Sequence, residues 1–160
     1  PDDSLAIAAR EGRLRRNFQG YTDDPATAII GLGASSIGSF RQGYVQNIPA
    51  TGVYEKTALE GKLAVVRGFA LSDEDRMRAW VIERIMCEFG FDTADLAARF
   101  GHRAATVLAE AHTVAAGDSM IMLSDNRFEI CPEARPVART IAARFDAYLG
   151  AGAARHSAAV

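Results

Sequence analysis

The most constraining feature of this sequence is the order of patterns between residues 72 and 149. Apolar residues recur every three to four positions after Ser72, which predicts a helix with one buried face that ends before Gly90. The elements predicted after it are helices over 92–100 and 104–115, strands over 120–123 and 127–131 joined by a Ser-Asp-Asn turn, and a last helix over 132–149. Three helices, a β-hairpin and a helix are the order of a winged-helix-like module.

Residues 1–70 predict shorter elements that cannot form a convincing domain alone. Asp2 or Asp3 can cap a first helix that stops near Gly12. The other predicted elements are strands over 28–32, 35–40, 44–47 and 63–69, and a helix that opens at Pro49 and ends at Gly61. Strands this short need neighbours. We therefore expect an α+β chain, mostly helical, in which residues 1–70 close a larger α/β body, 71–150 form a helical domain and 151–160 form a flexible tail.

Charge and hydropathy exclude several classes of function. The net charge of −2 gives no general attraction to nucleic acid or anionic membranes. The helix over 104–115, which would read DNA in a winged-helix protein, contains no Lys or Arg, and the tip of the hairpin is Asp125-Asn126. No apolar run approaches the ~20 residues that span a membrane, and no signal peptide is present. The sequence favours a cytoplasmic protein without nucleic-acid or membrane partners.

The cysteines and histidines indicate no metal site. Cys87 and Cys131 are too far apart in sequence for a CxxC motif and too few for a disulfide framework, so we interpret them as reduced, mostly buried thiols. None of the three histidines pairs with another ligand at metal-binding spacing. The chain begins at Pro1 rather than Met, which suggests a fragment of a longer polypeptide.

Two short stretches could line a ligand pocket. In the first, Phe18 and Tyr21 can supply flat apolar walls, while the amide of Gln19 offers a donor and an acceptor. A surface turn with two half-buried aromatics is the alternative.

The second stretch is the glycine loop Gly-Leu-Gly-Ala-Ser-Ser-Ile-Gly over residues 31–38. It lacks the third glycine of a dinucleotide fingerprint, because Ser36 stands there, and it lacks the lysine of a P-loop. Two interpretations stay open: a tight turn after a strand, or exposed backbone at Gly33 and Ser35 that lets a ligand approach.

A family resemblance rests on residues 1–12, 16–22, 31–37, 44–47 and 67–68, and on Arg76 and Val81-Ile82 in the helical part. These stretches resemble the oxygen-independent coproporphyrinogen III oxidases, a family of radical S-adenosylmethionine enzymes. The resemblance covers nearly the whole chain and is looser beyond Asp92. It implies that residues 1–70 are the C-terminal end of a partial α/β barrel and that 71–150 are the helical C-terminal domain.

The resemblance also implies a function and a set of ligands. Members use a [4Fe–4S] cluster and S-adenosylmethionine to decarboxylate two propionates of coproporphyrinogen III oxidatively to vinyl groups, which gives protoporphyrinogen IX for haem biosynthesis. By position, Gln19 and Ile37 match family residues that line the site of a second S-adenosylmethionine, where they would orient ligands rather than react. The remaining candidates for the same pocket are Phe18, Tyr21, Gly33 and Ser35.

One departure limits what this chain can do alone. The CxxxCxxC cluster motif is absent, and Cys87 and Cys131 cannot replace it because a cluster needs three close thiolates. We expect no catalytic residue in this chain, no cluster or S-adenosylmethionine bound to it, no activity of the isolated chain, and a missing N-terminal barrel as its partner. The electron donor and acceptor are not indicated.

Two other functions and one further role are open. Related haem chaperones share the barrel and a similar glycine loop, but they tend to lack the Asn-Phe-Gln-Gly-Tyr-Thr run and to carry histidine where this chain has Ser35-Ser36. A non-catalytic interaction module is conceivable for residues 72–149. Four arginines could each hold a propionate bidentately or lie solvated at the surface: Arg15, Arg16, Arg41 and Arg67.

Overall fold

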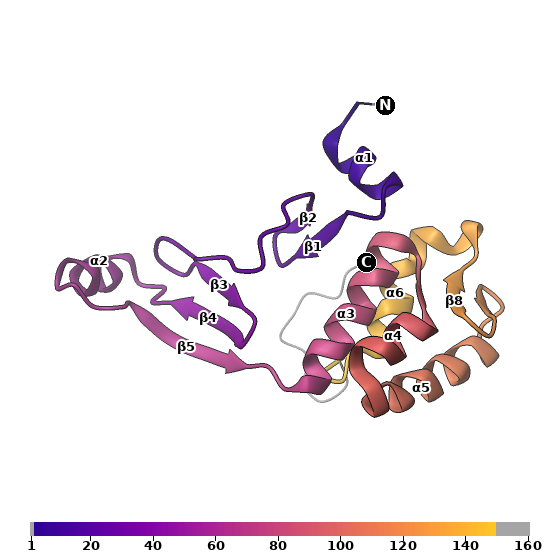
Figure 1. Ribbon diagram of the computed structural model, residues 1–160. Helices are drawn as coiled ribbons and strands as arrows, with labels where there is room; N and C mark the ends of the chain where they lie inside the picture. Colours follow the sequence, from indigo (N-terminus) through magenta and orange to yellow (C-terminus); the bar gives the residue numbers. More distant parts are fainter. Residues whose placement is uncertain (1, 150–160) are drawn as a thin grey trace. The chain divides into compact units, whose positions relative to one another are not determined.

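The computed structural model describes residues 2–149 (Figure 1), so the tail expected over 151–160 lies outside the described residues. The chain divides into two compact units, one made of residues 2–23 and 74–149 and the other of residues 24–73. This division groups residues 2–23 with the helical part, a grouping that the sequence patterns do not indicate. Each unit is described by itself below.

The helical unit contains the longest helix, α3 (Asp73–Glu88), followed by α4 (Thr93–Phe100), the 3-10 turn η1 (Gly101–Arg103) and α5 (Ala104–Ala116). Three short strands form an antiparallel sheet in the order β6-β8-β7, with β6 at Gly90–Asp92, β7 at Ile121–Leu123 and β8 at Arg127–Ile130. The chain then continues through η2 (Pro132–Val137), α6 (Ala138–Ala142) and η3 (Ala143–Phe145). This order confirms the predicted succession of helices and hairpin.

Three phenylalanines form the centre of this unit. Phe91 and Phe128 stack with ring centroids 5.1 Å apart, and the Phe145 ring meets both edge-on at 6.2 and 5.6 Å. On α3 the predicted apolar stripe is buried at Met77, Val81 and Ile85. Because β6, β8, η3 and α3 all contribute to it, this core fixes the helices against the small sheet.

A half-buried arginine ties three elements of this unit together. Arg78 on α3 donates to both carboxylate oxygens of Glu110 on α5, at 2.7 and 2.8 Å, and to the carbonyl oxygen of Phe145 in η3, at 3.1 Å. Its Nε also donates to Glu74 one turn earlier, at 2.9 Å. Pairing with Glu110 raises the pKa of Arg78, against the lowering effect of burial.

The N-terminal segment of the same unit starts with α1 (Ser4–Arg10), which Asp3 caps by accepting a hydrogen bond from the Ala6 N–H at 3.0 Å. A tight hairpin of β1 (Arg15–Asn17) and β2 (Gly20–Thr22) follows, where the sequence indicated only irregular or extended chain.

The second unit is a three-stranded antiparallel sheet with one helix. Its strands are β3 (Ile37–Phe40), β4 (Gly43–Asn47) and β5 (Val65–Ala70), in that order across the sheet, and α2 (Thr51–Leu59) connects β4 to β5. All residues of β5 are exposed on both faces. The two predicted hairpin strands, the predicted helix and the predicted third strand are therefore confirmed within two residues or so at each end.

Three local predictions are wrong. The run 28–32 is not a buried strand: it makes a single bridge from Ile29 to Ser39, and Ile30 and Leu32 are 73% and 83% exposed. The last helix is broken into η2, α6 and η3, because Pro136 lies inside it and cannot donate a helical hydrogen bond. The strand β6 was missed because Gly90, expected only to end a helix, also pairs with Glu129.

No helix among residues 2–149 is both long and apolar enough to cross a membrane.

Candidate functional site

The first candidate group, Phe18, Gln19 and Tyr21, belongs to the β1–β2 hairpin. Asn17 builds its turn, because its side-chain oxygen accepts from the N–H of Gln19 at 2.8 Å and from that of Gly20 at 3.2 Å. Gly20 has a φ of +147°, which favours glycine. Phe18 and Gln19 therefore form the two-residue tip, with Asn17 paired to Gly20 beneath them.

Both aromatics of this hairpin are partly exposed, Phe18 at 45% and Tyr21 at 46%, and the Gln19 side chain is exposed. The Tyr21 hydroxyl donates to the carbonyl oxygen of Met86 on α3 at 3.2 Å. The tip thus presents an amide and an aromatic ring to its surroundings on a turn whose backbone is held by hydrogen bonds.

The second candidate group, Gly33, Ser35 and Ile37, belongs to the loop that leads into β3. Its backbone is clamped from within its own unit: the Asn47 amide donates to the carbonyls of Gly31 and Gly33, both at 3.0 Å, and the Gly33 N–H donates to the Tyr54 hydroxyl at 3.0 Å. A Cβ at Gly31 would lie 2.8 Å from the carbonyl carbon of Ile37, so only glycine fits there.

Ser35 and Ile37 have different environments within this loop. Ser35 is exposed and has a φ of +59°, which is uncommon for a residue other than glycine, and its N–H donates to the Ile48 carbonyl at 3.1 Å. Ile37 is half-buried and pairs with Gln46 at the start of β3. The loop is therefore a turn whose backbone is held by hydrogen bonds, and a backbone held in this way also suits a preformed ligand contact.

A hollow of about 380 Å³ lies beside this loop. Its lining is mostly apolar, with Asn47, Tyr54 and Lys62 as the polar side chains, and Gly31 and Leu32 are the residues of the glycine loop that reach it. Gly33, Ser35 and Ile37 do not line it. The six candidate residues thus fall into two groups, one on a hairpin of the first unit and one on a loop of the second.

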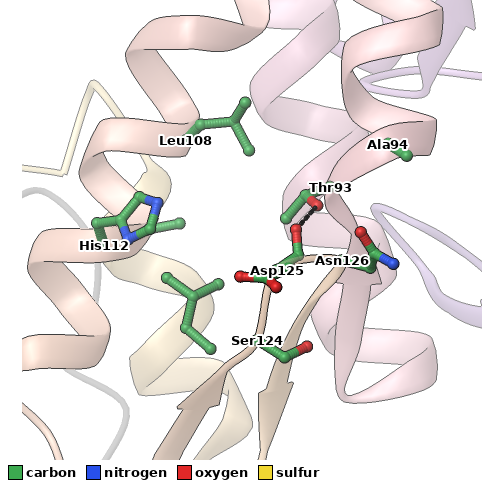
Figure 2. A pocket seen from close by; sticks show the side chains of 9 residues that line it. Thr93, Ala94, Leu108, His112, Ser124, Asp125 and Asn126 are labelled. Carbon is green, nitrogen blue, oxygen red and sulfur yellow. Dashed lines mark hydrogen bonds between the residues drawn. The ribbon is translucent and has the colours of Figure 1, made fainter.

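A hollow of about 410 Å³ lies in the helical unit between α4, α5 and the turn from β7 to β8 (Figure 2). His112 on α5 and Asp125 in the turn face it, and the Thr93 hydroxyl donates to the Asp125 carbonyl at 3.1 Å. Among the residues that line this hollow there is no Lys or Arg, so it offers no cation to a phosphate group.

The thiols do not fit an iron–sulfur cluster. Cys87 is buried and Cys131 half-buried, and both are free. Burial, and after it the charge of Glu83, raises the pKa of the Cys87 thiol to about 11. Within residues 2–149, no three His, Cys, Asp or Glu side chains gather in a way that could hold a metal ion. Any cluster would need thiolates that this chain does not bring together.

The four candidate arginines are exposed. Arg67 on β5 donates from Nε to the Gln46 side chain on β4 at 2.7 Å, which orients its guanidinium along the sheet. The sequence reasoning missed the residues that shape the two candidate groups, namely Asn17, Asn47 and Tyr54. An Asn three residues before a Gly is a recognisable turn signal, whereas nothing in the helical pattern around Tyr54 pointed to the glycine loop.

Comparison with known proteins shows what this chain is similar to. Residues 71–137 match the family model of the HemN C-terminal domain. The whole chain is 44% identical to an oxygen-independent coproporphyrinogen III oxidase of Bradyrhizobium diazoefficiens and covers 36% of that protein. An oxidase of the same name from Cereibacter sphaeroides is 48% identical over 92% of this chain, which covers 33% of that protein. Residues 71–137 thus match the HemN C-terminal domain, and the whole chain is similar to part of the oxygen-independent coproporphyrinogen III oxidases.

A solved structure agrees with this assignment. The chain superposes on HemN from Escherichia coli, a coproporphyrinogen III oxidase described as a radical SAM enzyme, with a TM-score of 0.83 and 34% identity over 93% of this chain and 35% of that one. The resemblance inferred from the sequence is thereby confirmed. The chain spans about a third of the length of these HemN relatives.

Proposed function

We propose that this chain acts as the C-terminal third of an oxygen-independent coproporphyrinogen III oxidase, which decarboxylates two propionates of coproporphyrinogen III to vinyl groups in the cytoplasm. The observation that carries this proposal is the 44% identity that extends over the entire chain to the Bradyrhizobium diazoefficiens oxidase.

The proposal assigns residues 1–70 to the end of the catalytic barrel and residues 71–150 to the helical domain that follows it. Since the cysteines of this chain cannot hold a cluster, the [4Fe–4S] group and its S-adenosylmethionine belong to the remaining N-terminal part of the protein. When bound there, they supply the radical that begins the oxidation. The residues of this chain would bind and orient ligands, and the chain alone would be inactive.

Gln19 and Ile37 are the residues we propose for a second S-adenosylmethionine. Gln19 supports this role because it is exposed at the tip of a turn whose backbone is already fixed by Asn17, so little ordering is needed when its amide binds a polar group. Ile37 supports it because it offers a half-buried apolar side chain on a loop that Asn47 and Tyr54 hold. Phe18, Tyr21, Gly33 and Ser35 would complete the surroundings.

A chimera tests the proposal. The N-terminal part of the Bradyrhizobium diazoefficiens relative is joined to this chain, the cluster is reconstituted without oxygen, and conversion of coproporphyrinogen III is followed by chromatography of the porphyrins. We expect turnover by the chimera and none by either part alone. A chimera that carries its cluster and binds haem tightly without decarboxylation would instead support the haem-chaperone function.

Single substitutions in the chimera test the residues. Gln19→Ala and Ile37→Ala should raise the S-adenosylmethionine concentration needed for half-maximal turnover, whereas Gln42→Ala, at another exposed glutamine in a tight turn, should not. Equal effects of Gln19→Ala and Gln42→Ala would remove Gln19 from the site.

A further inference from the structure

We propose that helix α3 of the helical domain holds the Phe18–Gln19 turn in position, with Tyr21 and Glu83 as the positioning residues. The ligand of the turn is taken from the proposed function. The contact between α3 and the turn rests instead on hydrogen bonds within one unit of the protein.

Two hydrogen bonds fasten the hairpin to α3, one from each strand. The Tyr21 hydroxyl on β2 donates to the Met86 carbonyl at 3.2 Å, and the Arg16 backbone N–H on β1 donates to Oε1 of Glu83 at 3.2 Å. Arg16 and Tyr21 pair with each other directly below the pair that closes the turn. The helix therefore contacts the hairpin one residue pair away from its tip.

The end of α3 is suited to receive this hairpin. Met86 lies among the last four residues of the helix, whose carbonyls have no partner within a helix. Phe89 leaves the helix with a φ of +59°, and its N–H bonds the Ile85 carbonyl at 3.1 Å, which leaves the next carbonyl, that of Met86, for the Tyr21 hydroxyl.

The Glu83 carboxylate is held from its other side. Its second oxygen lies 3.5 Å from the Arg84 guanidinium, and Arg84 also pairs with Glu88 one turn later. Because both ends of this acid are in contact, it keeps Oε1 on the Arg16 amide.

A buried thiol lies on the face of α3 that bonds the hairpin. Cys87 lies one turn after Glu83 and roughly 200° around the helix from Ile85, at about 100° per residue, so it points away from the core stripe. It is nevertheless only 5% exposed, although it is not part of the core cluster. The charge of Arg16 acts on its thiol by lowering the pKa, against the stronger raising effects of burial and Glu83. Cys87 therefore lies beside the two residues of α3 that bond the hairpin, Glu83 and Met86.

The link from α3 to Gln19 is continuous. Glu83 and Met86 hold Arg16 and Tyr21, and between these two the Asn17 side chain fixes the N–H groups of Gln19 and Gly20. If the hairpin leaves α3, the direction of the Gln19 amide is no longer defined, and a ligand that it binds loses a preorganised contact.

Thiol labelling of Cys87 measures whether α3 holds the hairpin. In a Cys131→Ala background, Tyr21→Phe should accelerate the reaction of Cys87 with a disulfide reagent by roughly fivefold, the change expected for one lost hydrogen bond of about 1 kcal/mol. Glu83→Ala should accelerate it further, because it also removes a charge that raises the Cys87 pKa. Glu83→Gln removes the same charge but keeps an acceptor oxygen for the Arg16 N–H, so it should react more slowly than Glu83→Ala. Circular dichroism confirms that each variant is folded.

Tyr148→Phe is the matched control. It also removes one hydroxyl that bonds to α3, but at Asp75, near the other end of the helix, at 2.8 Å. Its labelling rate should equal that of the parent. If Tyr21→Phe labels at the parent rate and Glu83→Ala labels no faster than Glu83→Gln, α3 does not hold the hairpin and the inference is wrong.

The chimera described above then tests the consequence for binding. Glu83→Ala should raise the S-adenosylmethionine concentration for half-maximal turnover severalfold and leave kcat at saturation nearly unchanged, with Tyr148→Phe unaffected. Faster Cys87 labelling with an unchanged half-saturation would overturn the positioning role. An inactive chimera would count against the proposed function alone, because the labelling experiment needs only this chain.

Discussion

Replacement of Glu110 by Ala probes the network around Arg78 that joins α3, α5 and η3. The Arg78 side chain is 11% exposed, and Glu110 provides two of its four hydrogen bonds. Breaking a fully buried pair costs about 3–5 kcal/mol, and an exposed pair contributes roughly 0.2–1 kcal/mol. Because Glu110 is 35% exposed, we place the loss of unfolding free energy between these limits, at about 2 kcal/mol.

Glu74→Ala is the control for this prediction. It removes one hydrogen bond from the same arginine, but Glu74 is 58% exposed, so we expect a loss of about 0.5 kcal/mol. Urea unfolding followed by Trp80 fluorescence is the assay, because this single tryptophan packs edge-on against Phe91 and Phe100. Equal losses for the two variants would refute the argument that burial of Arg78 determines the strength of the network.

Three further predictions concern the candidate site and the thiol. Gly31→Ala should shift the Ile37 backbone and destabilise the second unit by about 1–3 kcal/mol. Gly52→Ala should do neither, because a Cβ added there meets nothing within 4 Å. Amide chemical shifts measure the backbone shift, and unfolding measures the loss of stability. Asn17→Ala should make the Gln19 and Gly20 amides exchange roughly tenfold faster with solvent, and unchanged exchange would show that Asn17 does not build the turn. Because the native pKa of Cys87, about 11, lies above its ordinary 9.0, native protein keeps a proton that unfolded protein loses between these values. Stability should therefore fall as pH rises from 9 to 11, and less steeply for Cys87→Ala; identical slopes would contradict the shift.

Helical periodicity and caps predicted the helical unit well. The stripe on α3 and the Asp92 cap of α4, which accepts from Ala94 and Asp95, are local signals that each lie within a few residues. The sequence of β6 contains no such signal, because its three residues become a strand only through pairing with β8. The pairing is so close that a Cβ on Gly90 would lie 2.2 Å from the Phe128 carbonyl oxygen. Apolar composition misled at Ile30 and Leu32, since a run of apolar residues indicates burial only where another element covers it.

For the candidate site, the sequence indicated candidate residues but not the contacts that hold them. Phe18, Gln19 and the glycine loop could be singled out because turn residues and aromatics occur together in the sequence. The contacts that hold them could not be predicted. Arg16 and Glu83 are 67 residues apart, and Asn47 reaches the loop from 14 to 16 residues away, so these links exist only once the chain has folded.

The first unit is assembled from both ends of this sequence, and that arrangement affects where the protein can be cut. Boundaries taken from the family match, residues 71 and 137, would discard Ile141 and Phe145, which are 1% and 0% exposed. The same cut would remove the hairpin that bonds α3 beside Cys87. Such a truncated protein would be prone to aggregate and to oxidise at Cys87, so an excised helical domain would have to retain η3 and be supplied with residues 2–23, on the same polypeptide or as a separate peptide.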